Sequence, residues 1–303
     1  MSEIALVATD LDGTLINPQG HISEFTRAVL RAVEESGRDL VFVTGRPPRW
    51  MAPIVEETGH RGVAICANGA VVMDLHTEHI QTSHVLNEEQ AIEVAMRLRQ
   101  LLPTVAFAVE RVNGNRRSKV EFGREPHYIP RWPTPDNPPL APIEDLVVGG
   151  NIIKMLARVP MPDHGVEPAD VSENVGSLGP DPTRGFASAP LVDDFLAAAV
   201  EVIGNLATVT HSNPNDTLLE VSAPGVTKAT ALAEFARQRS IGPEGVLAFG
   251  DQPNDLPMLA WAGRSLAVAN AHPAVLAAVS ERAGSVHDDG VAHALVEILN
   301  LKI

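Results

Sequence analysis

The segment IALVATDLDGTLI, residues 4–16, is a short apolar run that ends in two carboxylates one residue apart. A continuous apolar run too short for a helix is typical of a central strand in a parallel sheet that is covered on both faces. Side-chain alternation predicts that Asp10 and Asp12 point the same way where this strand passes into its loop. Two carboxylates so close raise each other's pKa unless a cation lies between them or one keeps its proton. The segment therefore predicts a buried strand whose end needs a compensating partner.

Further strands follow at the spacing of α/β folds. Apolar side chains recur at helical spacing between Ser23, which suits an N-cap, and Gly37, which suits a helix terminator. The apolar run DLVFVTG (39–45) comes next, and GVAIC (62–66) ends in Ala-Asn-Gly-Ala. A right-handed crossover puts the loops after such strands at one edge of the sheet, where open α/β sheets bind ligands.

The carboxy-terminal part repeats this pattern. VLAFGD (246–251) is expected to be a strand that ends in an acid, and NDLPMLAWAG (254–263) a short helix. SLAVAN (265–270) is expected to be a strand and PAVLAAVSER (273–282) a helix. Together with the amino-terminal strands, these elements predict an α/β core with one doubly wound, Rossmann-like parallel sheet.

The middle of the chain does not continue that sheet. A helical pattern starts near Glu88, and the proline-rich stretch 129–146 suits neither a central strand nor a helix. NIIKMLARV (151–159) has the pattern of a strand and residues 191–204 that of a helix. Residues 208–222 are expected to form a hairpin with Asn-Pro-Asn-Asp at its turn.

These elements predict a separate α+β domain that is spliced into the sheet domain. We place the inserted domain at residues 84–221 and the core at residues 1–83 and 222–303.

Charge and composition exclude several classes of partner. The 303 residues carry a formal net charge of -15, which repels polyanions, so nucleic acid is not an expected partner. The chain is 45% hydrophobic and 20% charged, which is typical of soluble globular proteins, and it has no apolar run long enough for a membrane span. Cys66, the single cysteine, lies in an apolar run where an inert core thiol is expected. With no export signal or disulfide in view, we expect a cytoplasmic protein.

Several loops carry groups that suit a cation or an anion. Taken alone, Asp10 and Asp12 fit a strand end with two solvated acids as well as they fit a ligand site. TGR (44–46) follows the second strand with a hydroxyl, an open backbone N–H and a cation. Lys228 is expected at the start of a helix, where a lysine opposes the helix dipole and is better explained by an anionic ligand. GDQPND (250–255) brings further acids and an amide to another strand end.

In sequence and order, these segments resemble the four motifs of the haloacid dehalogenase superfamily: DLDGTL (10–15), TGR (44–46), GVTK (225–228) and GDQPND (250–255). The insert between the second and third motifs resembles the cap of its Cof-type subgroup IIB, a large α/β domain of the C2 type. NGA (68–70) and the terminal DDGVAHAL (288–295) fit the same resemblance. It implies a phosphatase that removes phosphate from a small metabolite ester, a sugar phosphate or a phosphorylated cofactor, with Mg²⁺ and an aspartyl-phosphate intermediate.

The resemblance also implies roles for single residues. Asp10 would attack the phosphorus, and Asp12 would protonate the leaving oxygen and then activate water. Mg²⁺ would be held by the Asp10 carboxylate, the Asp12 backbone carbonyl and Asp251, with Asp255 positioning these ligands. The phosphoryl oxygens would be bound by Thr44, the Gly45 backbone, Lys228 and Asn254. Arg46 is open between a role in the site and an ion pair with a surface acid.

Candidates for contact with the rest of the substrate lie in the inserted domain. A basic cluster of Arg116, Arg117 and Lys119 could meet a second anionic group, although a solvated turn is the commoner meaning of such a run. Lys154 interrupts an apolar strand, and its role is open between the cleft and the strand face. Three residues could wall a substrate ring or, more commonly, pack in a core: His127, Tyr128 and Trp132.

Other functions share parts of this pattern. A phosphotransferase or mutase would use the same aspartyl phosphate with an acceptor other than water, and a need for catalytic bisphosphate would favour it. A dehalogenase is disfavoured, because Asp12 protonates an alkoxide and has little use when halide leaves. A non-catalytic phosphate or Mg²⁺ binding module should lack at least one of Asp10, Asp12, Lys228 and Asp251, and this chain lacks none. The sequence leaves the oligomeric state open.

Overall fold

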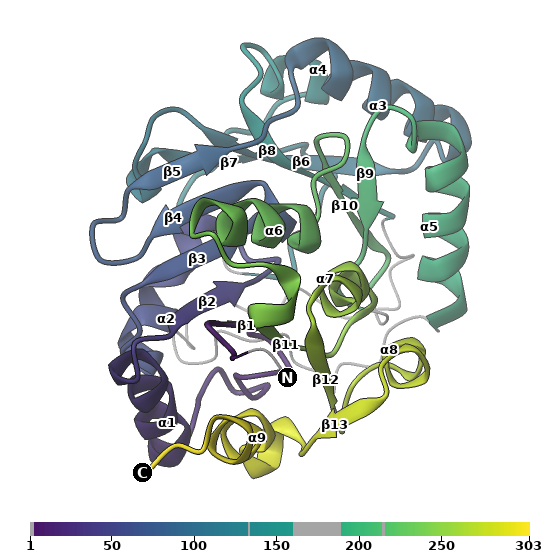
Figure 1. The fold of residues 1–303 in the computed structure, drawn as a ribbon. Helices are drawn as coiled ribbons and strands as arrows, with labels where there is room; N and C mark the ends of the chain where they lie inside the picture. Colours follow the sequence, from purple (N-terminus) through teal and green to yellow (C-terminus); the bar gives the residue numbers. More distant parts are fainter. Residues whose placement is uncertain (1–2, 133, 160–188, 214–215) are drawn as a thin grey trace.

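The computed structural model describes residues 3–132, 134–159, 189–213 and 216–303, which form two β-sheets with helices packed against them (Figure 1). The larger sheet is built from the two ends of the chain and the smaller sheet from its middle. The predicted α/β class is therefore confirmed.

The larger sheet has eight strands, in the spatial order β13 (Glu281–Ala283), β12 (Arg264–Val268), β11 (Val246–Gly250), β1 (Leu6–Thr9), β2 (Asp39–Val43), β3 (Val63–Cys66), β4 (Val71–Asp74) and β5 (Ile80–Ser83). Neighbouring strands from β13 to β3 pair in parallel, whereas β4 pairs antiparallel with both β3 and β5. The parallel core is the predicted one. The antiparallel edge was not anticipated.

Strand order reverses at β1, which lies between β2 and β11. On one side the chain continues from β1 to β2 and β3, and on the other side β11 leads to β12 and β13. Thr9 pairs with Phe42 of β2 and with Phe249 of β11, so these three strands end at the same level. Such a reversal is where open α/β sheets bind ligands, and the loops after β1, β2 and β11 meet there.

Helices cover both faces of the larger sheet (Figure 1). The helices of this part are α1 (Glu24–Glu35), α2 (Met51–Thr58), α6 (Lys228–Gln238), α7 (Leu256–Trp261), α8 (Pro273–Ala278) and α9 (Gly290–Leu299). As predicted, Ser23 is the N-cap of α1, and its Oγ accepts a hydrogen bond from Thr26 N at 2.9 Å. The single helix predicted for residues 273–282 is wrong, because Val279 has an extended backbone and the chain continues into β13.

The smaller sheet has five antiparallel strands, in the order β7 (Val120–Arg124), β6 (Ala106–Val112), β8 (Ile152–Arg158), β10 (Leu218–Ser222) and β9 (Thr208–Thr210). Its helices are α3 (Glu88–Leu101), α4 (Ile143–Leu146) and α5 (Ala189–Ile203). The hairpin of β9 and β10 is confirmed, but Pro214 and Asn215 of its predicted turn lie outside the described residues. β7 was not predicted, and neither was α4, a four-residue helix within the proline-rich stretch.

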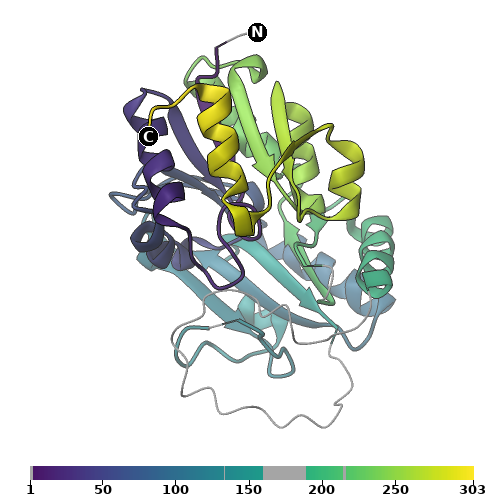
Figure 2. The same ribbon diagram turned by 90° about the horizontal axis from the view of Figure 1, so that it is seen from below.

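Alternate residues of β8 serve the two faces of the smaller sheet. Ile153 and Met155 pack into the main core together with apolar residues of α3 and α5. Leu156 joins a second, small apolar cluster on the opposite face. This second face also carries Lys154, which contacts the larger sheet's loops. Figure 2 shows β6, β7 and β8 of the smaller sheet, in teal, below the larger sheet.

Two expectations from composition can be compared with the fold. Cys66 is fully buried, and burial raises the pKa of its thiol, as expected for an inert core cysteine. Among the described residues, none of the helices has the length and apolar character that crossing a membrane requires.

Candidate active site

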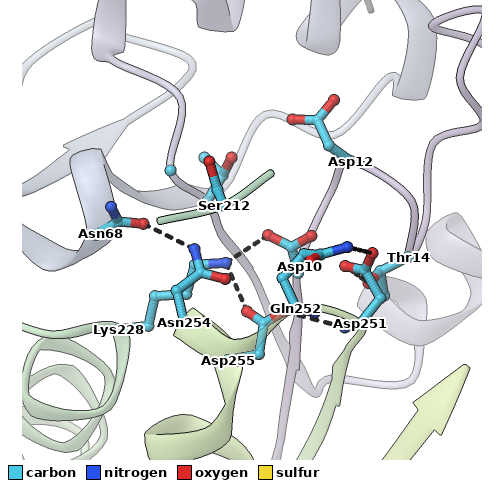
Figure 3. Close-up of polar contacts among 12 residues, drawn as sticks. Asp10, Asp12, Thr14, Asn68, Ser212, Lys228, Asp251, Gln252, Asn254 and Asp255 are labelled. Carbon is cyan, nitrogen blue, oxygen red and sulfur yellow. Dashed lines mark hydrogen bonds and ion pairs between the residues drawn. The ribbon is translucent and has the colours of Figure 1, made fainter. Parts of the chain in front are cut away.

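Three carboxylates meet where the strand order of the larger sheet reverses. Asp10 follows β1, and Asp251 and Asp255 follow β11. One oxygen of each carboxylate lies within 4.8 Å of the others, and all three residues are buried (Figure 3). Burial raises the pKa of Asp10 well above its usual value, and the charges of Asp255 and Asp251 raise it further against the opposing effect of Lys228. Such a group of acids favours a bound cation.

Lys228 contacts this acid cluster directly. Its Nζ donates to Asp10 Oδ1 and to Asp255 Oδ1, at 2.6 Å each. Burial lowers the pKa of Lys228, but the two carboxylates outweigh burial, so the pKa lies above its usual value and the side chain is charged. Thr227 caps the helix that begins at Lys228, and its side chain accepts from Thr230 N. The cap fixes the first turn, from which the lysine reaches back to β1.

The loop after β11 is held by its own acids and by the loop after β1. Asp255 Oδ2 accepts hydrogen bonds from the backbone N of Asp251 and of Gln252, at 3.0 Å each. Asp251 accepts from Thr14 Oγ1 and Gln252 Nε2, at 2.9 Å each. Burial and the charge of Asp255 raise the pKa of Asp251 to about 7 despite these bonds. The hydrogen bond from Thr14 to Asp251 thus joins the first and the fourth motif.

Gly13 makes this close approach of the two loops possible. Its φ is +81°, and a Cβ on it would lie 2.6 Å from Asp251 Oδ2. A carbon atom at that distance forces either the carboxylate or the loop to move. Glycine is therefore required at position 13 for two reasons: the backbone is in the left-handed region, and there is no space for a Cβ beside Asp251.

Gly37 gives a matched control for a test of this role. It has a φ of +80°, and no atom lies within 4 Å of the position of its Cβ. Both Gly13→Ala and Gly37→Ala should cost about 1 to 2 kcal/mol of unfolding free energy, because alanine is strained at positive φ. Only Gly13→Ala should also lower the phosphate release that the family resemblance implies, by roughly 100-fold, because it displaces Asp251. Equal activity of the two variants, measured beside their urea unfolding curves, would contradict the steric role.

Asp12 differs from the expectation that it points the same way as Asp10. Its carboxylate lies apart from the acid cluster (Figure 3) and pairs with Arg46, whose Nε lies 2.7 Å from Asp12 Oδ2. The alternation fails because β1 ends at Thr9, so the extended backbone does not reach Asp12 before the turn at Gly13. The side chain of Asp12 is 36% exposed, so solvent reaches its carboxylate.

Arg46 is a residue of this site and not a surface cation. Its side chain is 6% exposed, and burial lowers its pKa less than the hydrogen bond and the charge of Asp12 raise it. In the same loop, Thr44 Oγ1 accepts a hydrogen bond from Arg46 N at 3.0 Å. Thr44 O accepts from Asn68 N at 3.0 Å, so the loops after β2 and β3 are joined.

The sequence patterns gave no individual role to two buried residues that connect the site to the smaller sheet, Asn68 and Glu220. Asn68 Nδ2 donates to Glu220 Oε2 at 2.6 Å, and Asn254 Nδ2 donates to Asn68 Oδ1 at 3.2 Å (Figure 3). Asn254 Oδ1 is buried without a hydrogen-bond partner, so it could still bind a ligand group. An asparagine after a strand end suits the left-handed backbone at Asn68, and Glu220 is a lone acid in an apolar strand. Both signals are visible in the sequence.

The match to a known family covers most of the chain. The family described as haloacid dehalogenase-like hydrolase matches residues 7–126 and 189–295. The chain belongs to this family. The haloacid dehalogenase-like match includes the residues of all four motifs, namely Asp10, Thr44, Lys228 and Asp251 with their neighbours.

Two named phosphatases are similar to the chain over nearly their full length. The 5-amino-6-(5-phospho-D-ribitylamino)uracil phosphatase YcsE of Bacillus subtilis (strain 168) is 26% identical over 97% of this chain and 95% of its own. The HMP-PP phosphatase of Cronobacter sakazakii (strain ATCC BAA-894) is 24% identical over 97% and 96%. The structure of the HAD subclass IIB sugar phosphatase BT4131 has a TM-score of 0.70 at 17% identity and covers 97% of this chain and 98% of that one. The predictions of a subclass IIB fold and of a phosphatase are thereby confirmed.

The remaining candidates in the inserted part of this haloacid dehalogenase-like chain lie in different surroundings. Arg116 and Lys119 are exposed, and Arg117 pairs with Glu78, so the basic cluster is a solvated surface turn. The aromatic residues do not form one wall. His127 is exposed and Tyr128 is a core residue of the small apolar cluster, while the ring of Trp132 lies edge-on to that of Trp50 at 6.5 Å.

Proposed function

We propose that the chain is a Mg²⁺-dependent phosphatase that forms an aspartyl phosphate on Asp10. The observation that carries the proposal is the contact of Asp10 with Lys228 beside Asp251 and Asp255, at the point where the strand order reverses. A nucleophilic carboxylate, a fixed cation and a cluster of acids are the groups that phosphoryl transfer needs. The phosphatase names of the relatives support this reaction over a non-catalytic binding module.

The acids fit a magnesium ion. The three clustered oxygens are hard carboxylate donors, which Mg²⁺ prefers. Burial, and after it the charges of the neighbouring carboxylates, raise the pKa values of Asp10 and Asp251, and a bound cation would oppose both effects. Asp10, Asp251 and the Asp12 backbone carbonyl would hold the ion, and Asp255 would position the loop through its two backbone hydrogen bonds. When bound, the ion neutralises charge on the phosphoryl group.

The chain's own groups would then carry out two steps. In the first, an oxygen of Asp10 attacks phosphorus, the bond from phosphorus to the ester oxygen breaks, and Asp12 gives its proton to that oxygen. In the second, water attacks phosphorus, Asp12 takes its proton, and Asp10 is released with inorganic phosphate. Lys228, Thr44, the Gly45 N–H and Asn254 would bind the phosphoryl oxygens. Because Asp12 must gain a proton to act as the acid, its ion pair with Arg46 has to loosen when substrate binds.

The substrate class follows from the relatives and the insert. Two relatives are named as phosphatases of 5-amino-6-(5-phospho-D-ribitylamino)uracil and of HMP-PP, so we propose a small phosphorylated metabolite as the substrate. Residues 84–221 would form a cap that selects the leaving group of the substrate, and residues 1–83 and 222–303 would form the core beneath it. In support of this division, β5 belongs to the larger sheet and β8 to the smaller sheet. A cytoplasmic location fits the single buried cysteine.

A phosphate-release screen tests the function. Purified protein is incubated with a panel of sugar phosphates, nucleotides and phosphorylated cofactors, with Mg²⁺ or with excess EDTA. We expect steady release of inorganic phosphate from some esters with Mg²⁺ and none with EDTA. Phosphate release that begins only after addition of a sugar bisphosphate would favour the mutase alternative. If no ester of the panel releases phosphate, the proposal is wrong.

A further inference from the structure

Lys154 connects the smaller sheet to the loop after β2. Its side chain is 4% exposed and lies on β8, on the face that is turned toward the site. Nζ donates a hydrogen bond to the backbone carbonyl of Gly45 at 2.5 Å and another to Glu220 Oε2 at 2.5 Å. Lys154, a residue of the insert, thus contacts the backbone of the loop after β2, which binds phosphate in the proposed function.

The Gly45 carbonyl belongs to the peptide that joins Gly45 to Arg46. The other end of this peptide is Arg46 N, which donates to Thr44 Oγ1 at 3.0 Å. Lys154 therefore fixes the carbonyl end of the peptide between Gly45 and Arg46. The N–H end of the same peptide donates to Thr44 Oγ1 and so occupies one lone pair of that hydroxyl. With that lone pair occupied, the hydroxyl proton is free to turn toward an anion. The orientation of Thr44 depends in this way on a side chain of another sheet.

Glu220 holds Lys154 in this position. Burial raises the pKa of Glu220, but Lys154 and hydrogen bonds from Ser212 and Asn68 outweigh it, so the carboxyl is ionised at neutral pH. On the neighbouring strand β6, Glu110 lies opposite Lys154 and has its own cation, Arg49, with Nη2 at 2.7 Å. A buried ion pair stabilises a fold little better than apolar residues do, so its place at the junction of the two sheets indicates a specific task.

We propose that Lys154 is a positioning residue for phosphate binding: through the Gly45 carbonyl it sets the peptide that orients the Thr44 hydroxyl. The proposal rests on the proposed function. It makes the phosphate-binding loop complete only when the inserted domain is docked on the core. Substrate binding and closure of the insert are then linked by one hydrogen bond.

A double-mutant cycle tests this link. Lys154→Met is made in the wild type and in Thr44→Val, and kcat/KM is measured with Mg²⁺ and the best ester of the screen. We expect Lys154→Met alone to lose roughly 10- to 100-fold, the range for a hydrogen bond to a charged group. In the Thr44→Val background it should lose no more than about threefold, because the hydroxyl that it positions is gone.

Two further variants control for charge and for folding. Lys119→Met makes the same change at an exposed position of the insert and should leave kcat/KM unchanged. Lys154→Met combined with Glu220→Gln leaves no unpaired buried carboxylate and should show the same dependence on Thr44. Three outcomes would overturn the positioning role while the wild type still turns over. The first is that the kcat/KM losses of Lys154→Met and Thr44→Val multiply in the double variant. The others are that Lys154→Met alone loses no activity, or that the variant with Glu220→Gln does not fold. Absence of turnover in the wild type would instead overturn the proposed function, and this inference with it.

Discussion

Asp10→Asn is expected to abolish phosphate release with little change in stability. An amide has no nucleophilic oxygen, and removal of a nucleophile costs roughly 10⁴- to 10⁶-fold in kcat. Stability should hold because Asp10 is a buried acid whose pKa is raised by burial and by Asp255 and Asp251. Asn keeps the shape and can still accept the hydrogen bond from Lys228, which retains Asp255 as its ionic partner.

Asp39→Asn is the matched control for this experiment. Asp39 is a carboxylate of the same sheet, but it starts β2 at the opposite edge and pairs with Arg239 near the surface. This variant should turn over like the wild type. The measurements are kcat with the best ester, thermal unfolding with and without Mg²⁺, and intact mass after a rapid acid quench. A phosphorylated species in the wild type that is absent from Asp10→Asn supports the nucleophile, whereas Asp10→Asn with a tenth of wild-type activity would rule it out.

The parts of the site that depend on local sequence patterns could be predicted. The buried strand before Asp10, the acid-ended strand before Asp251 and the helix that begins at Lys228 are all found where their patterns place them. Parallel strands end at one edge of a sheet, so the meeting of these residues follows from topology once the strands are recognised. Gly13 is similar, because a glycine between an acid and a hydroxyl indicates a close approach of backbone.

The parts that depend on packing between distant segments were not predictable. Asp12 lies beyond the end of β1 and pairs with Arg46, 34 residues away, and alternation along β1 carries no information about this contact. Asn68 and Lys154 stand in recognisable turns and strands, but their joint contact with Glu220 appears only when the smaller sheet is placed on the core. Hydrogen bonds of this kind depend on how the two sheets are placed relative to each other. A short segment of sequence carries no information about that placement.

Asp12→Ala is expected to slow the reaction according to the leaving group. A general acid contributes roughly 100- to 10,000-fold when the leaving oxygen is basic, so alkyl phosphates should lose activity in that range. An activated aryl phosphate leaves without a proton, so formation of the aspartyl phosphate from 4-nitrophenyl phosphate should slow by less than about tenfold. Release of nitrophenol in the first turnover is the measurement, because Asp12 also serves the later attack by water. Equal losses on both kinds of ester would count against the acid role.

Asp12→Asn separates proton transfer from the contact with Arg46. Asn can accept the hydrogen bond that Arg46 Nε donates at 2.7 Å, so it preserves the partner of the guanidinium, but it cannot give a proton to an ester. If Asp12 is the acid, Asn and Ala variants should lose alkyl phosphate activity to within about threefold of each other, because both lack the proton. If Asp12 serves only to hold Arg46 beside the substrate, the Asn variant should keep most of the wild-type rate and the Ala variant should not. The comparison thus assigns the 36% exposed carboxylate either to the chemistry or to the guanidinium that it contacts.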